Sequence, residues 1–111
     1  MDNSLKESLD HANKMKVFNN QLRLLKEKYL ERNIYFTIGH QFTIDLKLIN
    51  YCITLKNQNK IKDVIMLDDY DLPVRIDDLE SFYDNIMDLY QQNLNAYIVE
   101  YNKLVQDKGR I

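Results

Sequence analysis

The sequence predicts an α+β fold in which a long N-terminal helix and a long C-terminal helix enclose two short β-hairpins that flank a middle helix. Apolar residues recur at steps of three and four near both ends of the chain, as in amphipathic helices. Between them, residues 34–44 and 64–76 contain alternating apolar positions, which is typical of half-buried strands. Because 111 residues is the usual length of one domain, we expect a single domain over residues 1–111.

The first third of the chain is predicted to form one helix, with Ser4 as its N-cap. A helix of about 26 residues would be about 39 Å long, more than a compact domain of this size requires. Residues 1–30 therefore either pack along the last helix or project and bind a partner. The stripe that defines this helix consists of Leu5, Leu9, Ala12, Met15, Phe18, Leu22, Leu25 and Tyr29.

A change of period at Asn33 predicts a hairpin over residues 34–43, with Ile34, Phe36 and Ile38 alternating before the turn. Gly39 at the first central position of a two-residue loop indicates a type II′ turn. A middle helix of about thirteen residues is expected next, with Thr43 as a possible cap and Asp45 in its first turn. Alternation at Phe42, Ile44, Leu46 and Leu48 leaves a longer strand as an alternative.

Residues 64–76 predict a second hairpin, because two apolar runs flank a turn rich in aspartate. Pro73 has no amide hydrogen to donate, so its strand should lie at an edge or direct that position outward. Asp77 is a suitable N-cap for the last helix, and Glu80 could return a hydrogen bond to its backbone amide. Apolar and aromatic residues then continue to Leu104, and Gly109 is expected to end the helix.

Composition excludes several function classes. The net charge of -2 and a pI of about 5.6 argue against nucleic acid, which basic surfaces bind. No stretch is apolar enough for a membrane helix, and the acidic first residues predict no secretory signal. Cys52 is the only cysteine and is predicted to be a small buried hydrophobe, so no internal disulfide can form.

No motif for catalysis, for a metal or for a cofactor is present. The acidic turn at residues 68–71 lacks the glycine and the ligand spacing of a calcium loop. The chain has no glycine-rich phosphate loop and no nucleophile elbow. We therefore expect a protein that is not an enzyme and that uses no cofactor. Its candidate functional residues are partner-binding ones, namely Leu5, Leu9, Met15, Phe18, Leu22, Asp68, Asp69 and Asp71.

Two stretches carry a resemblance to a known family: IGHQFTID at residues 38–45 and VIMLDDYDLPVRI at residues 64–76, followed by an acid-started helix from Asp77. Together they resemble a small domain of unknown function that recurs in bacteriophage tail and tail-fibre proteins. The resemblance implies a non-enzymatic virion component, located in the virion or in the host cytoplasm before assembly. Its partners would be virion proteins or further copies of itself, in a homo- or hetero-oligomer, with no nucleic acid or membrane involved.

Two hypotheses follow. In the first, the protein is a bacteriophage structural or adaptor protein that assembles through its helices, above all through residues 1–30. In the second, it is a small acidic regulatory protein whose hairpin at residues 63–80 inhibits or adapts a host protein by occupying a basic surface.

Overall fold

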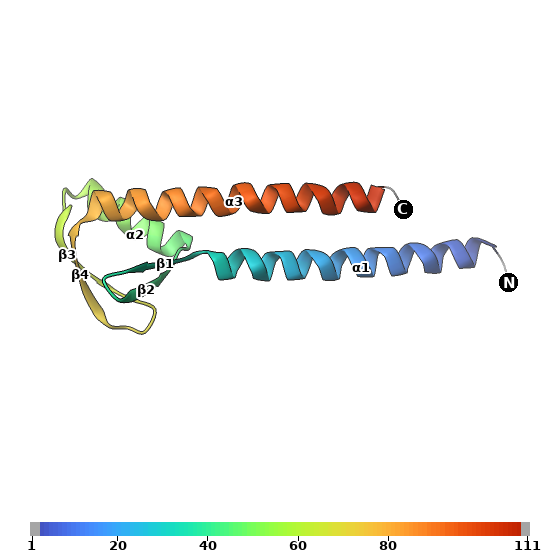
Figure 1. The fold of residues 1–111 in the computed structure, drawn as a ribbon, viewed down its shortest axis with the longest axis horizontal. Helices are drawn as coiled ribbons and strands as arrows, with labels where there is room; N and C mark the ends of the chain where they lie inside the picture. Colours follow the sequence, from blue (N-terminus) through green and yellow to red (C-terminus); the bar gives the residue numbers. More distant parts are fainter. Residues whose placement is uncertain (1–2, 110–111) are drawn as a thin grey trace. The chain divides into compact units, whose positions relative to one another are not determined.

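The computed structural model describes residues 3–109 and confirms the predicted α+β fold. Figure 1 shows a long helix at each end of the chain, and the sequence that connects the two helices forms two antiparallel hairpins and a shorter helix. In chain order the elements are α1 (Asn3–Arg32), β1 (Ile34–Thr37), β2 (His40–Thr43), α2 (Leu46–Asn57), β3 (Lys62–Leu67), β4 (Pro73–Asp78) and α3 (Leu79–Gly109).

The described residues form two compact units. A helical unit comprises residues 3–30 and 94–109, and a mixed unit comprises Glu31–Asn93. The helical unit therefore contains most of α1 and the C-terminal part of α3. The mixed unit contains both hairpins, α2 and the first part of α3.

In the helical unit, α1 packs antiparallel to the C-terminal part of α3. The rings of Tyr29 and Tyr97 meet edge to face with their centroids 5.1 Å apart. Nearby, Nζ of Lys28 lies 3.3 Å from Oε1 of Glu100. The residues of α1 on this face are buried or half-buried and follow the alternating three-and-four spacing of a coiled-coil seam. They are Met15, Phe18, Leu22, Leu25 and Tyr29.

The first hairpin has a different turn from the predicted one. Thr37 pairs with His40, so the two-residue loop is Ile38–Gly39 and not Gly39–His40. Ile38 has φ 52° and Gly39 has φ 76°, and positive values at both central positions are those of a type I′ turn. This register sets Tyr35 opposite Phe42, and both rings contact Phe82 edge to face.

The buried face of β1 also differs from the prediction. The alternation at Ile34, Phe36 and Ile38 suggested an inward-facing set, yet Phe36 is 69% exposed and Ile38 is 71% exposed. Tyr35 packs against the core instead. The aromatic contact with Phe82 therefore outweighs the apolar character of the neighbouring positions.

Three predicted helix caps are wrong. Ser4 lies inside α1, which already begins at Asn3. Asp45, not Thr43, caps α2, because its side chain accepts a hydrogen bond from the Leu48 amide at 2.8 Å. α2 begins directly after this cap, at Leu46, so the alternative of a longer strand through Leu48 is also wrong.

At the start of α3 the cap is Asp78 and not Asp77, since β4 extends through Asp78. The Asp78 carboxylate accepts hydrogen bonds from the Glu80 amide, the Ser81 amide and the Ser81 hydroxyl. The Ser81 bonds, followed by that from Glu80, lower the pKa of the Asp78 carboxyl below its ordinary value. The Ser81 hydroxyl thus makes a side-chain contact with the carboxylate of the cap, which differs from the predicted bond between Glu80 and the backbone amide of the cap.

The second hairpin confirms the expectation for Pro73. β3 and β4 pair antiparallel, with Pro73 opposite Leu67 and Val74 opposite Met66. The Asp68 amide donates to the Leu72 carbonyl at 2.9 Å, so this pair is a hydrogen-bonded one. Hydrogen-bonded and non-bonded pairs alternate along an antiparallel ladder, which places Pro73 at a position where no amide hydrogen is required.

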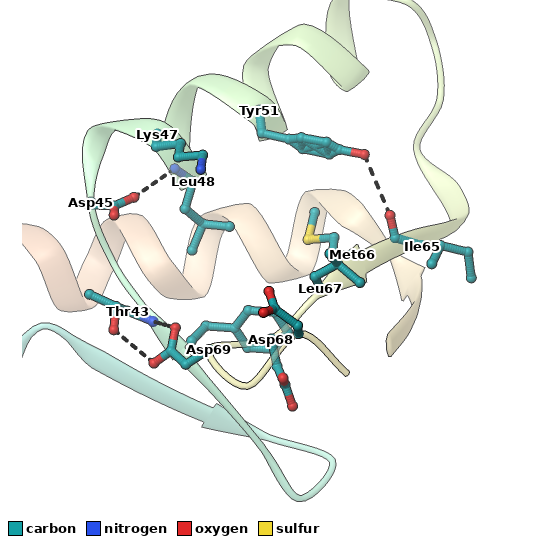
Figure 2. Close-up of a pocket in the computed structure, with 12 residues that line it drawn as sticks. Thr43, Asp45, Lys47, Leu48, Tyr51, Ile65, Met66, Leu67, Asp68 and Asp69 are labelled. Atoms are coloured by element: carbon teal, nitrogen blue, oxygen red, sulfur yellow. Dashed lines mark hydrogen bonds between the residues drawn. The ribbon is translucent and has the colours of Figure 1, made fainter. Parts of the chain in front are cut away.

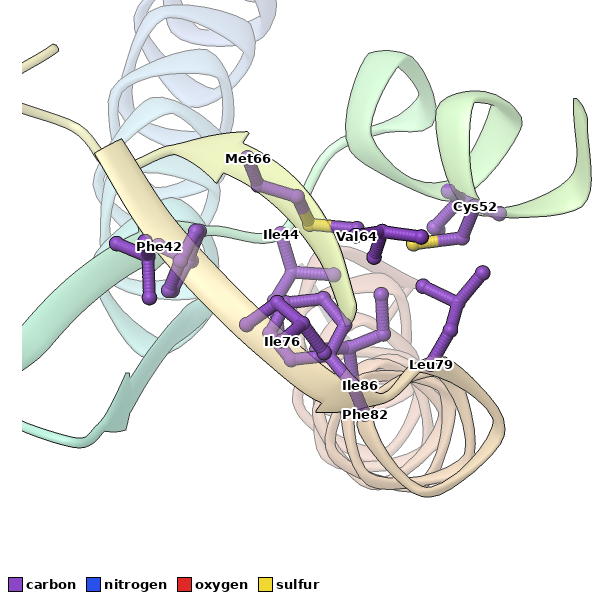
Figure 3. Packing of buried hydrophobic residues seen from close by; sticks show 11 residues of the cluster. Phe42, Ile44, Cys52, Val64, Met66, Ile76, Leu79, Phe82 and Ile86 are labelled. Atoms are coloured by element: carbon purple, nitrogen blue, oxygen red, sulfur yellow. The ribbon is translucent and has the colours of Figure 1, made fainter. Parts of the chain in front are cut away.

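The core of the mixed unit lies where the inner faces of β3 and β4 meet α2 and the first turns of α3 (Figure 3). Val64 and Met66 of β3 are buried, whereas the alternate residues Ile65 and Leu67 are exposed, as the period of a half-buried strand requires. Cys52 is fully buried in this core, as predicted. The other buried members are Phe42, Ile44, Ile49, Val74, Ile76, Leu79, Phe82 and Ile86.

Candidate functional site

The acidic turn after β3 joins the two hairpins of the mixed unit. Oδ2 of Asp68 lies 2.7 Å from Nδ1 of His40, and the Asp68 side chain is only 2% exposed. Oδ1 accepts hydrogen bonds from the amides of Tyr70 and Leu72. These contacts, that with His40 first, hold the pKa of the Asp68 carboxyl below its ordinary value. Asp68 therefore orders its own turn and ties it to β2.

Asp69 makes a second link, along the outer edge of β2. Its amide donates to the Gln41 carbonyl at 2.9 Å, in the way that a neighbouring strand residue would. Its carboxylate accepts from the Thr43 amide, the Thr43 hydroxyl and the Gln41 side chain, at 2.8 to 2.9 Å. One residue of the second hairpin thus satisfies the free edge of the first hairpin.

Asp71 differs from Asp68 and Asp69, the other two aspartates that were predicted to bind a partner. It is exposed in the turn, where its φ of 62° is in the left-handed region. Its amide donates to the Asp68 carbonyl at 3.1 Å, which helps to close the turn. Of the three predicted aspartates, Asp68 and Asp69 hold the hairpins together, and Asp71 presents its carboxylate at the surface.

The three aspartates line one end of a groove between α2 and β3. The groove has a volume of about 480 Å³, within the range of small ligand sites. In Figure 2 the Tyr51 side chain extends from α2 toward β3, where its hydroxyl lies 3.5 Å from the Ile65 carbonyl oxygen. Four aspartates and one lysine give the groove a negative charge. Its lining is Phe42, Thr43, Asp45, Lys47, Leu48, Tyr51, Ile65, Met66, Leu67, Asp68, Asp69 and Asp71.

The predicted partner-binding residues of α1 fall into two groups. Met15, Phe18 and Leu22 are half-buried on the face that packs on α3, whereas Leu5 is 50% exposed and Leu9 is 49% exposed. The spacing explains this difference. From Leu9 through Ala12 to Met15 the stripe advances by two successive steps of three residues, which fall about 120° short of two full turns.

The sequence stripe is therefore not one face. Leu5 and Leu9 lie on a side of α1 that is rotated away from the coiled-coil seam. In the described part of α1 before Met15, residues 3–14, every residue is exposed. The structure brings Met15, Phe18 and Leu22 together with α3 and leaves Leu5 and Leu9 at the surface.

Sequence reasoning missed several residues that shape these sites. His40 was given no role from the sequence, but its ring contacts the buried Asp68 carboxylate. Thr43 was expected to cap the middle helix and Tyr51 was given no contact, yet their hydroxyls bond to Asp69 and to the Ile65 carbonyl oxygen. The pairs His40–Asp68 and Thr43–Asp69 are separated by 28 and 26 residues, and no local pattern marks contacts of that range.

Two further properties of residues 3–109 concern metal binding and membrane insertion. In this part of the chain, no group of three or more His, Cys, Asp and Glu side chains is arranged to hold a metal ion. None of the described helices has an apolar stretch that could span a bilayer. Comparison of the chain with protein-family models, with curated proteins and with solved structures gave no match.

Proposed function

We propose that this protein is a non-enzymatic structural or adaptor protein that assembles with protein partners through the N-terminal segment of α1. The observation that carries the proposal is that every residue from 3 to 14 is exposed, with Leu5 and Leu9 about half-exposed on one side of the helix. A helical segment of about twelve residues that buries no apolar side chain is marginally stable in water. Burial of its leucines against another chain would stabilise it.

The spacing of these leucines suits such a contact. Leu5 and Leu9 are four residues apart, so their side chains lie one above the other on the same side of α1. They are rotated away from the seam that Met15, Phe18 and Leu22 form with α3. A partner could therefore cover them without disturbing the packing of the helical unit.

The setting of this assembly is part of the proposal. A virion component of a bacteriophage, acting with copies of itself or with a neighbouring virion protein, is supported by the resemblance of residues 38–45 and 64–76. The assembly mechanism does not depend on that setting, because it rests on the exposed segment of α1.

The test is the solution mass of the full chain by light scattering over a range of concentrations. We expect an oligomer that dissociates in the Leu5→Glu/Leu9→Glu double variant, because the charges would have to be buried. Lys6→Glu is the matched control, since it changes the net charge by the same amount within the same segment. It should leave the mass unchanged.

A foreign partner is distinguished from self-association by a photo-crosslinker placed at Leu9 in cells that contain the partner. A monomer in solution that forms a discrete crosslink from Leu9, and none from Lys6, would assign the segment to another protein. A monomer that gives no crosslink from either position would contradict the proposal.

A further inference from the structure

The outer edge of β3 carries backbone groups with no strand to pair them among the described residues. β3 pairs only with β4 in a two-stranded sheet. The bond from the Asp68 amide to the Leu72 carbonyl fixes the alternation of the ladder. Since Leu67 and Ile65 fall at non-hydrogen-bonded pairs, their amides and carbonyls point away from β4.

Tyr51 gives an independent check of this orientation. Its hydroxyl reaches the Ile65 carbonyl oxygen from α2, at 3.5 Å, so this carbonyl does face outward (Figure 2). A contact at that distance is a weak hydrogen bond. The amide hydrogen of an incoming strand would be a better donor to Ile65, and Tyr51, which is 43% exposed, can give way to it.

Hollows of opposite charge lie along this edge, on either side of Tyr51. Near Leu67 is the acidic groove of about 480 Å³, with Asp45, Asp69 and Asp71 in its lining. Toward the start of β3 is a second hollow of about 660 Å³ with a positive balance. Its lining is Tyr51, Leu55, Asn59, Lys60, Ile61, Lys62, Asp63, Val64 and Ile65.

Apolar surface connects the two hollows. Ile65 is 50% exposed and Leu67 is 59% exposed, and Leu48 of α2 lines the same groove. An exposed strand edge with apolar side chains is a template for another strand, and natural edges of this kind are normally covered or charged. Here the charges stand at the two ends of the edge and leave its centre apolar.

We propose that the outer edge of β3 binds an extended segment of a protein partner as an added antiparallel strand. The segment has an apolar centre that contacts Ile65 and Leu67. It carries lysine or arginine at its N-terminal end, beside Asp45 and Asp71, and aspartate or glutamate at its C-terminal end, beside Lys60 and Lys62. Backbone bonds supply affinity, and the end charges set direction.

The antiparallel direction is the energetically favoured one, and it fixes which end of the segment meets which hollow. Antiparallel pairing is slightly more stable per residue than parallel pairing. β3 runs from the basic hollow at Lys62 to the acidic groove at Leu67, so an antiparallel segment begins at the acidic groove. This binding edge lies in the mixed unit and does not involve Leu5 or Leu9, so it can be tested separately from assembly through α1.

The experiment titrates the full-length ¹⁵N-labelled chain with two capped peptides of identical composition. The first is acetyl-KKVTVTVEE-amide, and the second is acetyl-EEVTVTVKK-amide. We expect the first peptide to bind at least about tenfold more tightly, a difference of about 1.4 kcal/mol. On binding, the amides of Ile65 and Leu67 should become protected from hydrogen exchange.

Two variants of the same hairpin locate the contact. Leu67→Lys places a like charge beside the lysines of the first peptide and should weaken binding by at least about tenfold. Leu72→Lys is the matched control, because Leu72 is 52% exposed in the same hairpin but lines neither hollow. It should bind like the wild type. Ile65→Lys provides a second edge variant if the spectrum of Leu67→Lys shows loss of fold.

Three results would overturn the proposal. One is the absence of saturation by the first peptide up to about 1 mM. Another is equal affinity for the two peptides, which would show that the charges at the ends of the edge do not set the direction of the bound segment. The third is equal weakening by Leu67→Lys and Leu72→Lys, which would move the contact away from β3.

Discussion

The Nδ1 atom of His40 lies 2.7 Å from Oδ2 of Asp68, although the two residues belong to different hairpins. His40 is the first residue of β2, and Asp68 follows the last residue of β3. The Asp68 side chain is almost completely buried and also accepts two backbone hydrogen bonds from its own turn. The junction of the hairpins therefore depends on an ionised carboxylate.

This arrangement predicts a specific dependence of stability on pH. The pKa of Asp68 is lowered, so its stabilising contribution is complete well above the ordinary aspartate pKa of about 4. The contribution declines below that value and is lost once the pH has fallen through the lowered pKa. Asp68→Asn should therefore be less stable than the wild type at neutral pH, and the difference should shrink in acid.

Urea unfolding of both proteins between about pH 7 and pH 2 measures this difference. Asp78 also has a lowered pKa, but it is present in both proteins, so its effect cancels in the comparison. Asp71→Asn serves as the control, because Asp71 is exposed and asparagine tolerates its positive φ. A gap between Asp68→Asn and wild type that stays constant across the pH range would refute the explanation.

The link between Asp69 and Thr43 predicts a measurable coupling energy. Asp69→Ala removes three hydrogen bonds at the edge of β2 and should lower the free energy of unfolding by about 1–3 kcal/mol. Thr43→Val removes the hydroxyl bond alone and should cost about 0.5–1.5 kcal/mol. In the double variant the losses should be less than additive, because the two residues share a contact.

Chemical denaturation of the four proteins in this cycle gives the coupling directly. Asp77→Ala, at an exposed aspartate of β4, is the control and should change stability by no more than about 0.5 kcal/mol. Strict additivity of Asp69→Ala and Thr43→Val would show that the hydroxyl bond contributes nothing.

The elements of this fold could be predicted from local patterns, because their periods are strong. The two-residue period of β3 buries Val64 and Met66 and exposes Ile65, and the outward position of Pro73 follows from its missing amide hydrogen. Cap positions were harder to predict. Asp77 and Asp78 are equally good capping residues, and the length of β4 decides between them.

The sites could be predicted only in part, for two physical reasons. The phase of a helical stripe changes where steps of three residues follow one another, so Leu9 and Met15 point to different sides of α1. The structural role of Asp68 and Asp69 depends on their contacts with His40 and Thr43, which are distant in the sequence. A run of aspartates alone does not distinguish a solvated turn from a junction.

The packing of α2 predicts that substituting two isoleucines of this helix by alanine lowers the free energy of unfolding by different amounts. Ile49 is 6% exposed in the core, and Ile53, one turn later, is 38% exposed. Ile49→Ala should cost about 2–5 kcal/mol, because it removes buried methyl and methylene groups and leaves a cavity. Ile53→Ala should lower the free energy of unfolding by less than about 1 kcal/mol, because much of the Ile53 side chain stays in contact with water in the folded protein. Equal losses in chemical denaturation would show that the two side chains are buried to the same extent.

The rate at which the Cys52 thiol is modified should report how often the core of the mixed unit opens. Its thiol is fully buried, and burial raises its pKa to about 11 against the opposing effect of Lys56. The reactive thiolate is therefore scarce at neutral pH, and the reagent cannot reach the sulfur in the folded state. We expect Ellman's reagent to modify the native protein at a rate set by opening of the mixed unit, many times slower than in urea.

Measuring the rate of Cys52 modification in Ile49→Ala as well tests whether modification requires the core to open. If modification of Cys52 requires the core to open, the cavity in Ile49→Ala should speed it up in proportion to the loss of stability, about tenfold for each 1.4 kcal/mol. Ile53→Ala should leave the rate close to that of the wild type. Rapid labelling of the native wild type, at the rate seen in urea, would show that α2 leaves the core without global unfolding.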